Sequence, residues 1–333
     1  MKLKHQMNIL LVAEETAGLQ ALRLISNSNH HLSGVLTTVI SQDVENYGNT
    51  SDEIAGVFKK TLNASITAAA GGLGVPVMDA SRVEKSDFTA WMDSHHIDIL
   101  LNVHSLYRIC PEVLQSVRVG AFNLHPGPLP GYSGLNVPSW AVYNEETTHA
   151  VTLHHITDKI DSGHIVYEKE FPLTSMDTGL TVSTKCVQSG MKLIEQLLKE
   201  LCRDPLSIPS RPQDLSQRNV YKRDKIPGGG YIQWSEPAHK IDAFVRACNY
   251  SPFPSPWGEP KTKWGNKKIS ILKTELSNKI CSEVPGTVGR IIDGKAAIAT
   301  GDDWILVAKC KLTGENVLAS SFLKHGDKLT SVL

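Results

Sequence analysis

The chain has 333 residues, with 34 basic and 34 acidic side chains, so its formal charge is zero when histidine is counted as neutral. That length predicts about two domains, and 41% apolar with 20% charged residues is ordinary globular usage, which argues against intrinsic disorder. The balanced charge argues against a general polyanion binder. No apolar run approaches the ~20 residues of a membrane helix. Six cysteines without a Cys-x-x-Cys pair favour free thiols in a reducing cytoplasm.

Short apolar runs alternate with helical patterns over the first two hundred residues, and this alternation predicts a mainly parallel α/β sheet. Several runs are apolar on both faces, as expected for strands covered by helices on both sides. The predicted strands are Asn8–Ala13, Val35–Ile40, Ile97–Val103, Ala121–Leu124, Val151–Ile156 and His164–Phe171. The predicted helices are Thr16–Ser26, Asp52–Ala70, Asp87–Ser94, Pro111–Ser116 and Leu180–Leu201.

Proline and glycine interrupt the chain after Asp204, which predicts an extended linker over residues 205–229. Beyond the linker, a helix at Ala238–Cys248 precedes short strands separated by Gly, Asp and Asn turns. These strands are expected at Lys268–Leu272, Thr287–Ile292, Ala296–Thr300 and Trp304–Lys309. The pattern predicts a small β-barrel. We therefore expect an α/β domain over residues 1–204 and a barrel domain over residues 230–333.

Charge is distributed unevenly between the two halves. Residues 1–202 hold 14 basic and 21 acidic side chains, a difference of −7, and residues 203–333 hold 20 and 13, a difference of +7. A basic second half could face a phosphate-bearing partner. The simpler alternative is a solvated surface that complements the acidic first half.

The segment Ala121–Gly134 carries the first candidate chemistry. A short strand delivers Asn123 and His125 to its end, and strand alternation places both side chains on one face. Ligands of open α/β sheets bind at the carboxyl ends of the strands. Three prolines within the next five residues fix a stiff loop. The Asn amide can donate to a carbonyl oxygen that becomes an oxyanion, and the His can donate a second hydrogen bond or move protons.

A second group of polar residues lies at His154–Gly163, where a strand enters a tight turn that contains Asp161. A carboxylate there can orient a histidine and tune its pKa. His154 and His155 alternate across the strand, so at most one faces the cleft, and a packed histidine is an equal alternative. No pair of histidines matches a zinc motif, so we expect no metal. No nucleophile elbow is present, which favours direct transfer between two bound substrates.

The motif Asn-x-His-Pro-x-x-Leu-Pro, followed by Asp-x-Gly, resembles the formyltransferases that use 10-formyltetrahydrofolate. That family includes methionyl-tRNA formyltransferase, glycinamide ribonucleotide formyltransferase and the sugar-nucleotide N-formyltransferases. The resemblance covers most of the chain. Further similar segments are Asn8–Ala13, Asp98–Leu114, Gln233–Ala238 and Val245–Ala247.

The resemblance implies a Rossmann-like formyltransferase domain followed by an OB-like barrel, with 10-formyltetrahydrofolate as formyl donor. It implies a catalytic trio of Asn123, His125 and Asp161. Asn123 would bind the formyl oxygen, His125 would polarise the formyl group or stabilise the intermediate, and Asp161 would hold His125 in its working protonation state. The backbone of the folate pocket would be supplied by Arg108, Ile109, Cys110, Ile156, Thr157 and Asp158.

The acceptor amine is less closely specified. The tRNA-specific members carry a basic insertion after the second strand, whereas Ser41–Glu53 here holds four acids and no Lys or Arg. This composition disfavours phosphate contact. Asn249–Lys261 is similar to formyltransferases of amino sugars and of peptide natural products. We therefore expect a small-molecule or carrier-bound amine, either an amino-sugar nucleotide or an amino-acid or peptide precursor.

Three alternatives stay open, together with the oligomeric state. A methionyl-tRNA formyltransferase would suit the basic linker and barrel. A 10-formyltetrahydrofolate hydrolase is disfavoured because the related dehydrogenase has an apolar residue at the position of Asn123. A nucleic-acid binder without catalytic activity could use aromatic and basic residues of the barrel, such as Trp264 and Trp304.

Overall fold

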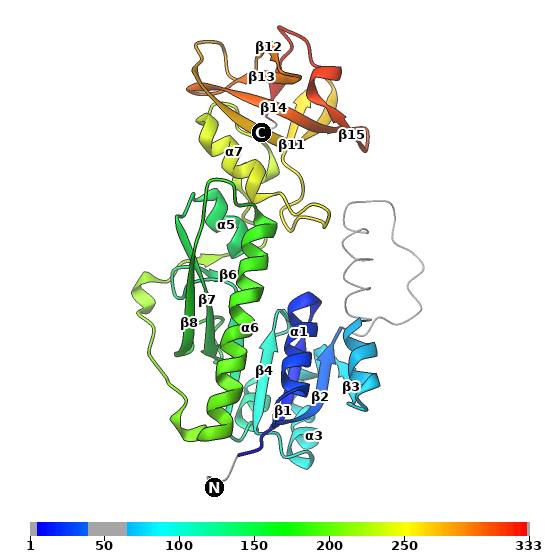
Figure 1. Cartoon of the computed structure of the whole chain (residues 1–333), viewed down its shortest axis with the longest axis vertical. Helices are drawn as coiled ribbons and strands as arrows, with labels where there is room; N and C mark the ends of the chain where they lie inside the picture. Colours follow the sequence, from blue (N-terminus) through cyan, green and yellow to red (C-terminus); the bar gives the residue numbers. More distant parts are fainter. Residues whose placement is uncertain (1–4, 39–64, 332–333) are drawn as a thin grey trace. The chain divides into compact units, whose positions relative to one another are not determined.

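The computed structural model describes residues 5–38 and 65–331 (Figure 1). The chain forms two compact units that are interleaved in sequence. The first comprises Met1–Gly134, Thr148–Phe171 and Thr184–Val220, and the second comprises Leu135–Thr147, Pro172–Ser183 and Tyr221–Leu333. The domain limits at residues 204 and 229 stay predictions. Among the described residues, no helix is long and apolar enough to cross a membrane.

The first unit contains a seven-stranded sheet with the strand order β3-β2-β1-β4-β5-β7-β8. The first five of these are parallel, and β7 runs antiparallel to β5. The sheet is therefore mainly parallel, as predicted. The strands are β1 (Asn8–Ala13), β2 (His31–Thr37), β3 (Val77–Asp79), β4 (Ile99–Val103), β5 (Gly120–His125), β7 (Thr148–His155) and β8 (Ile165–Pro172).

Both faces of this sheet are buried. On β1, Ile9 and Leu11 pack in one hydrophobic cluster, with residues of α1 and α6, whereas Leu10 and Val12 pack in a second cluster, with residues of α3 and α4. This two-sided burial explains why the central strands are apolar throughout. The α-helices contributing to this unit are α1 (Glu15–Ser26), α3 (Thr89–Ser94), α4 (Pro111–Gln115) and most of α6 (Gly179–Arg203).

Three predictions reach beyond the described residues, and one of them is the strand predicted over Val35–Ile40, of which residues 39 and 40 lie outside. The helix predicted over Asp52–Ala70 lies outside them up to residue 64, and residues 65–72 are helical. The acidic segment Ser41–Glu53 also lies outside them.

Short 3₁₀ helices occur at Ala80–Glu84, Ser86–Phe88, Pro205–Ser207, Leu215–Gln217, Pro227–Gly230 and Ala319–Ser321.

The second unit is built on an antiparallel sheet with the order β12-β13-β14-β11-β10-β16, and β15 pairs with β14. Hydrogen bonds from Val288 N–H to Asp327 O and from Leu329 N–H to Gly286 O, both 2.8 Å, join the two ends of the sheet. The result agrees with the predicted OB-like barrel. The strands are β10 (Lys261–Trp264), β11 (Lys267–Ile280), β12 (Val288–Ile292), β13 (Lys295–Ala299), β14 (Asp303–Leu312), β15 (Glu315–Leu318) and β16 (Leu329–Thr330).

Two helices of the second unit, α5 (Val137–Tyr143) and α7 (Ala238–Ala247), share an aromatic cluster. The ring of Tyr143 lies 6.1 Å from that of Phe244, and the ring of Trp140 lies 4.8 Å from that of Trp257. Helix α5 therefore packs with residues that follow it by about a hundred positions in the chain.

Most of the predicted linker belongs to the first unit rather than running free. Arg211 exchanges backbone hydrogen bonds of 2.8 and 2.9 Å with Ile165 at the start of β8. Further along, β9 (Val220–Tyr221) pairs with the two-residue strand β6 (Ser133–Gly134). The segment thus follows the first unit through defined backbone contacts.

Candidate active site

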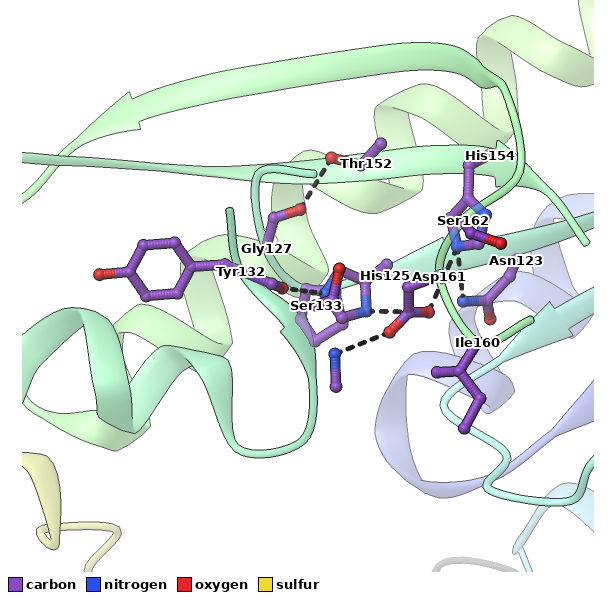
Figure 2. Close-up of polar contacts among 12 residues, drawn as sticks. Asn123, His125, Gly127, Tyr132, Ser133, Thr152, His154, Ile160, Asp161 and Ser162 are labelled. Atoms are coloured by element: carbon purple, nitrogen blue, oxygen red, sulfur yellow. Dashed lines mark hydrogen bonds and ion pairs between the residues drawn. The ribbon is translucent and has the colours of Figure 1, made fainter. Parts of the chain in front are cut away.

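A row of polar side chains crosses three neighbouring strands of the first sheet. Asn102 on β4 is the parallel partner of Asn123 on β5, and Asn123 is the antiparallel partner of His154 on β7. Directly paired residues project from the same face of a sheet, so the three side chains meet there. His125 lies two positions beyond Asn123 on β5 and shares that face. Figure 2 shows His125, Asn123 and His154 around the carboxylate of Asp161.

The neighbours of Asn123 fix the orientation of its side-chain amide. Asn102 Nδ2 donates to the carbonyl oxygen of Ser105 at 3.2 Å and to Asn123 Oδ1 at 3.0 Å. Because Ser105 offers only an acceptor there, the NH₂ group of Asn102 must face that side. Asn123 therefore turns its oxygen to Asn102 and its Nδ2 to His154 Nε2, 3.0 Å away. One N–H of Asn123 Nδ2 is used by His154, and the other can donate to a substrate oxygen.

Backbone carbonyl groups also set the tautomers of the two histidines. His125 Nε2 donates to the carbonyl oxygen of Tyr132 at 2.6 Å, and His154 Nδ1 donates to that of His155 at 2.8 Å. A neutral imidazole has one N–H. The lone pairs therefore lie on His125 Nδ1 and His154 Nε2, which are the two nitrogens nearest to Asp161.

Asp161 lies in the turn of residues 157–163 that follows β7, here named the Asp161 turn. Its Oδ1 lies 3.6 Å from His125 Nδ1 and 3.5 Å from His154 Nε2. Its Oδ2 accepts a 2.8 Å hydrogen bond from the backbone N–H of Gly134. The carboxylate thus lies between the two imidazoles, and only 8% of its surface is exposed. The structure brings together all three residues of the predicted trio.

The Asp-x-Gly motif requires glycine at position 163 for a steric reason. A Cβ atom on Gly163 would lie 1.8 Å from the carbonyl oxygen of His155, so the Asp161 turn can approach β7 only with glycine there. Within the turn, the hydroxyl groups of Thr157 and Ser162 lie 3.0 Å apart, and both donate to the carbonyl oxygen of Lys159.

The charges of the site follow from burial and proximity. Burial alone would raise the pKa of Asp161, but His125, His154 and the Gly134 N–H favour the carboxylate and hold its pKa well below the usual range. Burial lowers the pKa of His125 below 6.5, although Asp161 and the carbonyl oxygen of Tyr132 act in the opposite direction. At neutral pH the site therefore holds an ionised Asp161 beside a neutral His125, whose Nδ1 can accept a proton.

Strand β7 anchors the proline loop that follows His125. Thr152 donates to the carbonyl oxygen of Gly127 at 2.7 Å, and His149 Nε2 donates to that of Pro126 at 2.9 Å. His149 is almost fully buried, and burial lowers its pKa to about 4. It is therefore neutral at physiological pH and keeps the N–H directed at Pro126.

Comparison with protein families identifies the chain. A family model described as formyl transferase matches residues 7–198, and one described as formyl transferase, C-terminal domain, matches residues 227–326. The chain belongs to the formyl transferase family. It is a formyltransferase, as the sequence motifs predicted.

Solved structures with the same fold include sugar N-formyltransferases. An enzyme from Helicobacter canadensis, solved with folinic acid and dTDP-3-aminofucose, is 17% identical with a TM-score of 0.63, covering 91% of this chain and 99% of that one. The sugar 3N-formyltransferase WlaRD, solved with dTDP and 5-N-formyl-THF, is 15% identical with a TM-score of 0.60, covering 91% and 97%. HypX from Aquifex aeolicus is 14% identical with a TM-score of 0.59, covering 95% of this chain and 47% of that one.

The six residues predicted for the folate pocket of this formyltransferase fall on two segments that the structure joins. Arg108 donates from its guanidinium to the carbonyl oxygen of Asp158 at 3.0 Å. The backbone N–H groups of Cys110 and Ile156 are already used, by Val83 O at 2.8 Å and Ala121 O at 2.9 Å. Ile156 would therefore meet a pterin with its carbonyl oxygen, whereas the carbonyl oxygen of Cys110 already accepts from the N–H of Leu114 at 3.1 Å. The Ile109 side chain is buried in the core, so only its backbone could take part.

Two neighbours of the trio are absent from the predicted site. The sequence predicts that at most one of His154 and His155 faces the site, and the antiparallel pairing with Asn123 shows that it is His154. Asn102 was not predicted to belong to the site, although a polar residue in the apolar run Ile99–Val103 was a signal. Among residues 5–38 and 65–331, no group of three His, Cys, Asp or Glu side chains is placed to hold a metal ion.

Proposed function

We propose that this formyltransferase transfers the formyl group of 10-formyltetrahydrofolate to the amine of a small-molecule or carrier-bound acceptor. The observation that carries the proposal is the convergence of an amide donor, Asn123, and an unprotonated imidazole nitrogen, His125 Nδ1, beside the ionised Asp161. Folate compounds in the solved structures of the Helicobacter enzyme, of WlaRD and of HypX support the choice of donor.

In the proposed reaction, the lone pair of the acceptor amine attacks the formyl carbon, and a C–N bond forms as the carbonyl oxygen gains negative charge. Asn123 donates its second N–H to that oxygen. His125 Nδ1 accepts the proton lost by the amine, and Asp161 stabilises the imidazolium that results. Collapse of the intermediate breaks the bond between the formyl carbon and N10 of the folate, and His125 returns the proton to N10. No covalent enzyme intermediate is formed.

The acceptor is proposed to be an amino-sugar nucleotide or an amino-acid or peptide precursor. Two of the similar structures contain dTDP or a dTDP-linked amino sugar, which supports an acceptor of this class. The acidic composition of Ser41–Glu53 argues against a tRNA acceptor, because four carboxylates would repel the phosphate backbone. The amine must arrive unprotonated, since an ammonium group has no lone pair.

The test follows labelled formyl from 10-formyltetrahydrofolate into a cell extract treated with the purified enzyme or with its Asn123→Ala variant. Label in a small metabolite or on a carrier protein supports the proposal. Label in RNA would establish the tRNA alternative, and label only in formate would establish the hydrolase. Loss of the Asn123 donor is expected to lower kcat about 10²–10³-fold, which corresponds to about 2.7–4 kcal/mol. A variant with unchanged kcat would remove Asn123 from the mechanism.

A further inference from the structure

The predicted linker contains two side chains that bind the backbone of the Asp161 turn. We propose that Gln213 and Arg218 are positioning residues, which hold this turn in the conformation that places the Asp161 carboxylate between His125 and His154. The inference rests on the proposed function for its kinetic consequence, but its structural part can be tested without any acceptor.

The backbone of Asp161 needs external support. Its φ angle of +51° lies in the left-handed region, where residues with a Cβ are strained. Such a conformation persists only where the surrounding structure fixes it. The hydroxyl groups of Thr157 and Ser162 bind the carbonyl oxygen of Lys159, and neither bonds to the carbonyl oxygen of Asp161. The internal contacts of the turn therefore leave the backbone of Asp161 to other donors.

Gln213 and Arg218 supply these donors. Gln213 Nε2 donates to the carbonyl oxygen of Asp161 at 3.1 Å and to that of Gly163 at 2.5 Å, so one amide holds the backbone on both sides of Ser162. Arg218 donates to the carbonyl oxygen of Ile160 at 2.5 Å. Three of the four carbonyl groups of residues 160–163 thus accept hydrogen bonds from one short segment. Because every partner is a carbonyl oxygen, the orientation of the Gln213 amide is fixed.

The same segment also binds the loop that follows His125. The backbone N–H of Asn219 donates to the carbonyl oxygen of Pro130 at 3.3 Å, and the N–H of Ser133 donates to Asn219 at 3.0 Å. The next residue, Gly134, donates its N–H to Asp161 Oδ2. The segment therefore connects the two loops whose relative position brings Asp161 close to His125.

The consequence for catalysis follows from distance. Asp161 lies 3.6 Å from His125 Nδ1, close enough for a direct ion pair once the imidazole accepts a proton. A change of φ at Asp161 would swing its Cβ and carboxylate away, and a displacement of about 1 Å in a catalytic group can cost about 10²-fold in rate. Asp161, His154, His104 and His149 are titratable groups that interact with His125, and of these Asp161 is the one that stabilises its protonated form.

The test compares Gln213→Met with Gln217→Met. Methionine keeps the length of glutamine and removes the donor, and Gln217 is exposed and lies in the same segment. We expect Gln213→Met to lower kcat at least tenfold, with KM for the formyl donor within about twofold. Its Tm should fall by no more than a few degrees, because two hydrogen bonds are lost. Gln217→Met should behave as the wild type. A Gln213→Met enzyme with wild-type kcat, or one whose kcat returns to the wild-type value when it is assayed well below its Tm, would overturn the proposal.

A second measurement needs no formyl transfer. Histidine labelled with ¹⁵N reports the titration of His125, assigned by comparison with a His125→Asn variant. Gln213→Met should lower the pKa of His125, because the stabilising carboxylate withdraws, and Gln217→Met should not change it. In an Asp161→Asn background, Gln213→Met should leave the titration unaltered. An unchanged titration of Gln213→Met in the wild-type background would refute the positioning role even if the enzyme proves to use another donor.

Discussion

Asn102 orients the amide of Asn123, the proposed donor to the formyl oxygen. Its amide donates to Asn123 Oδ1 and so turns the Asn123 NH₂ group to the opposite side. Replacing Asn102 with Leu removes this donor and leaves the Asn123 amide with one fewer of the two partners, Asn102 and His154, that orient it. We expect kcat to fall about fivefold to tenfold, since a hydrogen bond of this kind contributes about 1 kcal/mol.

The measurement is a double-mutant cycle on kcat. If Asn102 acts through Asn123, Asn102→Leu should have no further effect in an Asn123→Ala enzyme. An equal loss in both backgrounds would show that Asn102 supports the site in another way. The folding stability of each variant, measured by thermal unfolding, serves as the control.

At the scale of the elements, the sequence predicts the buried strands better than the exposed ones. Strand β1 was predicted with its observed limits, Asn8–Ala13, because both of its faces are apolar and the run is bounded by charge. Strand β10, Lys261–Trp264, was not predicted, because a half-buried and an exposed lysine on either side of one buried threonine give a weak alternation. Its assignment depends on pairing with β11 and β16, which local composition does not encode.

The same distinction applies to the site. Asn123, His125 and Asp161 were predicted because each stands in a short motif, and the structure brings them together. The row of Asn102, Asn123 and His154 depends on the register of three strands, and register is a tertiary property that no local pattern contains. The contacts of Gln213 could not be predicted for a related reason, since composition predicts an extended linker but does not indicate that it binds a turn about fifty residues earlier.

His149 on strand β7 should make the free energy of unfolding of the chain depend on pH. The pKa of His149 is about 4 in the folded chain and 6.5 in the unfolded one, so the unfolded state binds the proton first as the pH falls. Stability is therefore fully present above pH 6.5 and declines toward pH 4. For this one group the loss between pH 7.5 and pH 5 is about 2 kcal/mol.

Urea unfolding of the wild type and of His149→Phe at several pH values isolates this contribution. Phenylalanine fills the ring volume and does not titrate. The unfolding free energy of the wild type minus that of His149→Phe should therefore decrease as the pH falls, because only the wild type loses the contribution of His149. Other groups with shifted pKa values, including the buried His125, the half-buried His155 and Asp161, add to the pH dependence of both proteins. Parallel curves for the two proteins would show that His149 contributes nothing to it.

At the scale of the whole molecule, the two compact units cannot be separated by a single cut. Helix α5 lies early in the chain, but its rings of Trp140 and Tyr143 pack with Phe244 and Trp257 of the second unit. A chain ending at Val220 would keep α5 and lose these partners. We expect this fragment to bind a hydrophobic dye and to aggregate, because exposed aromatic surface of this kind promotes association.

Dye fluorescence and light scattering of the fragment, compared with the full chain, measure this effect. A matched fragment carrying Trp140→Ser and Tyr143→Ser should bind less dye and stay in solution longer, because it lacks the two aromatic rings that the truncation exposes. A fragment of residues 1–220 that unfolds cooperatively as a dye-free monomer would show that the first unit is autonomous.

The interleaving of the units also sets an order of events on the ribosome. Helix α5 is synthesised about 100 residues before α7, which at about 5–20 residues per second amounts to roughly 5–20 seconds. During that interval Trp140 and Tyr143 lack their later aromatic partners Phe244 and Trp257. The nascent chain therefore passes through a period in which its N-terminal sheet can form before the residues that pack against α5 have been synthesised. Chaperone binding should be concentrated in this period, and slower translation between residues 143 and 238 would prolong it.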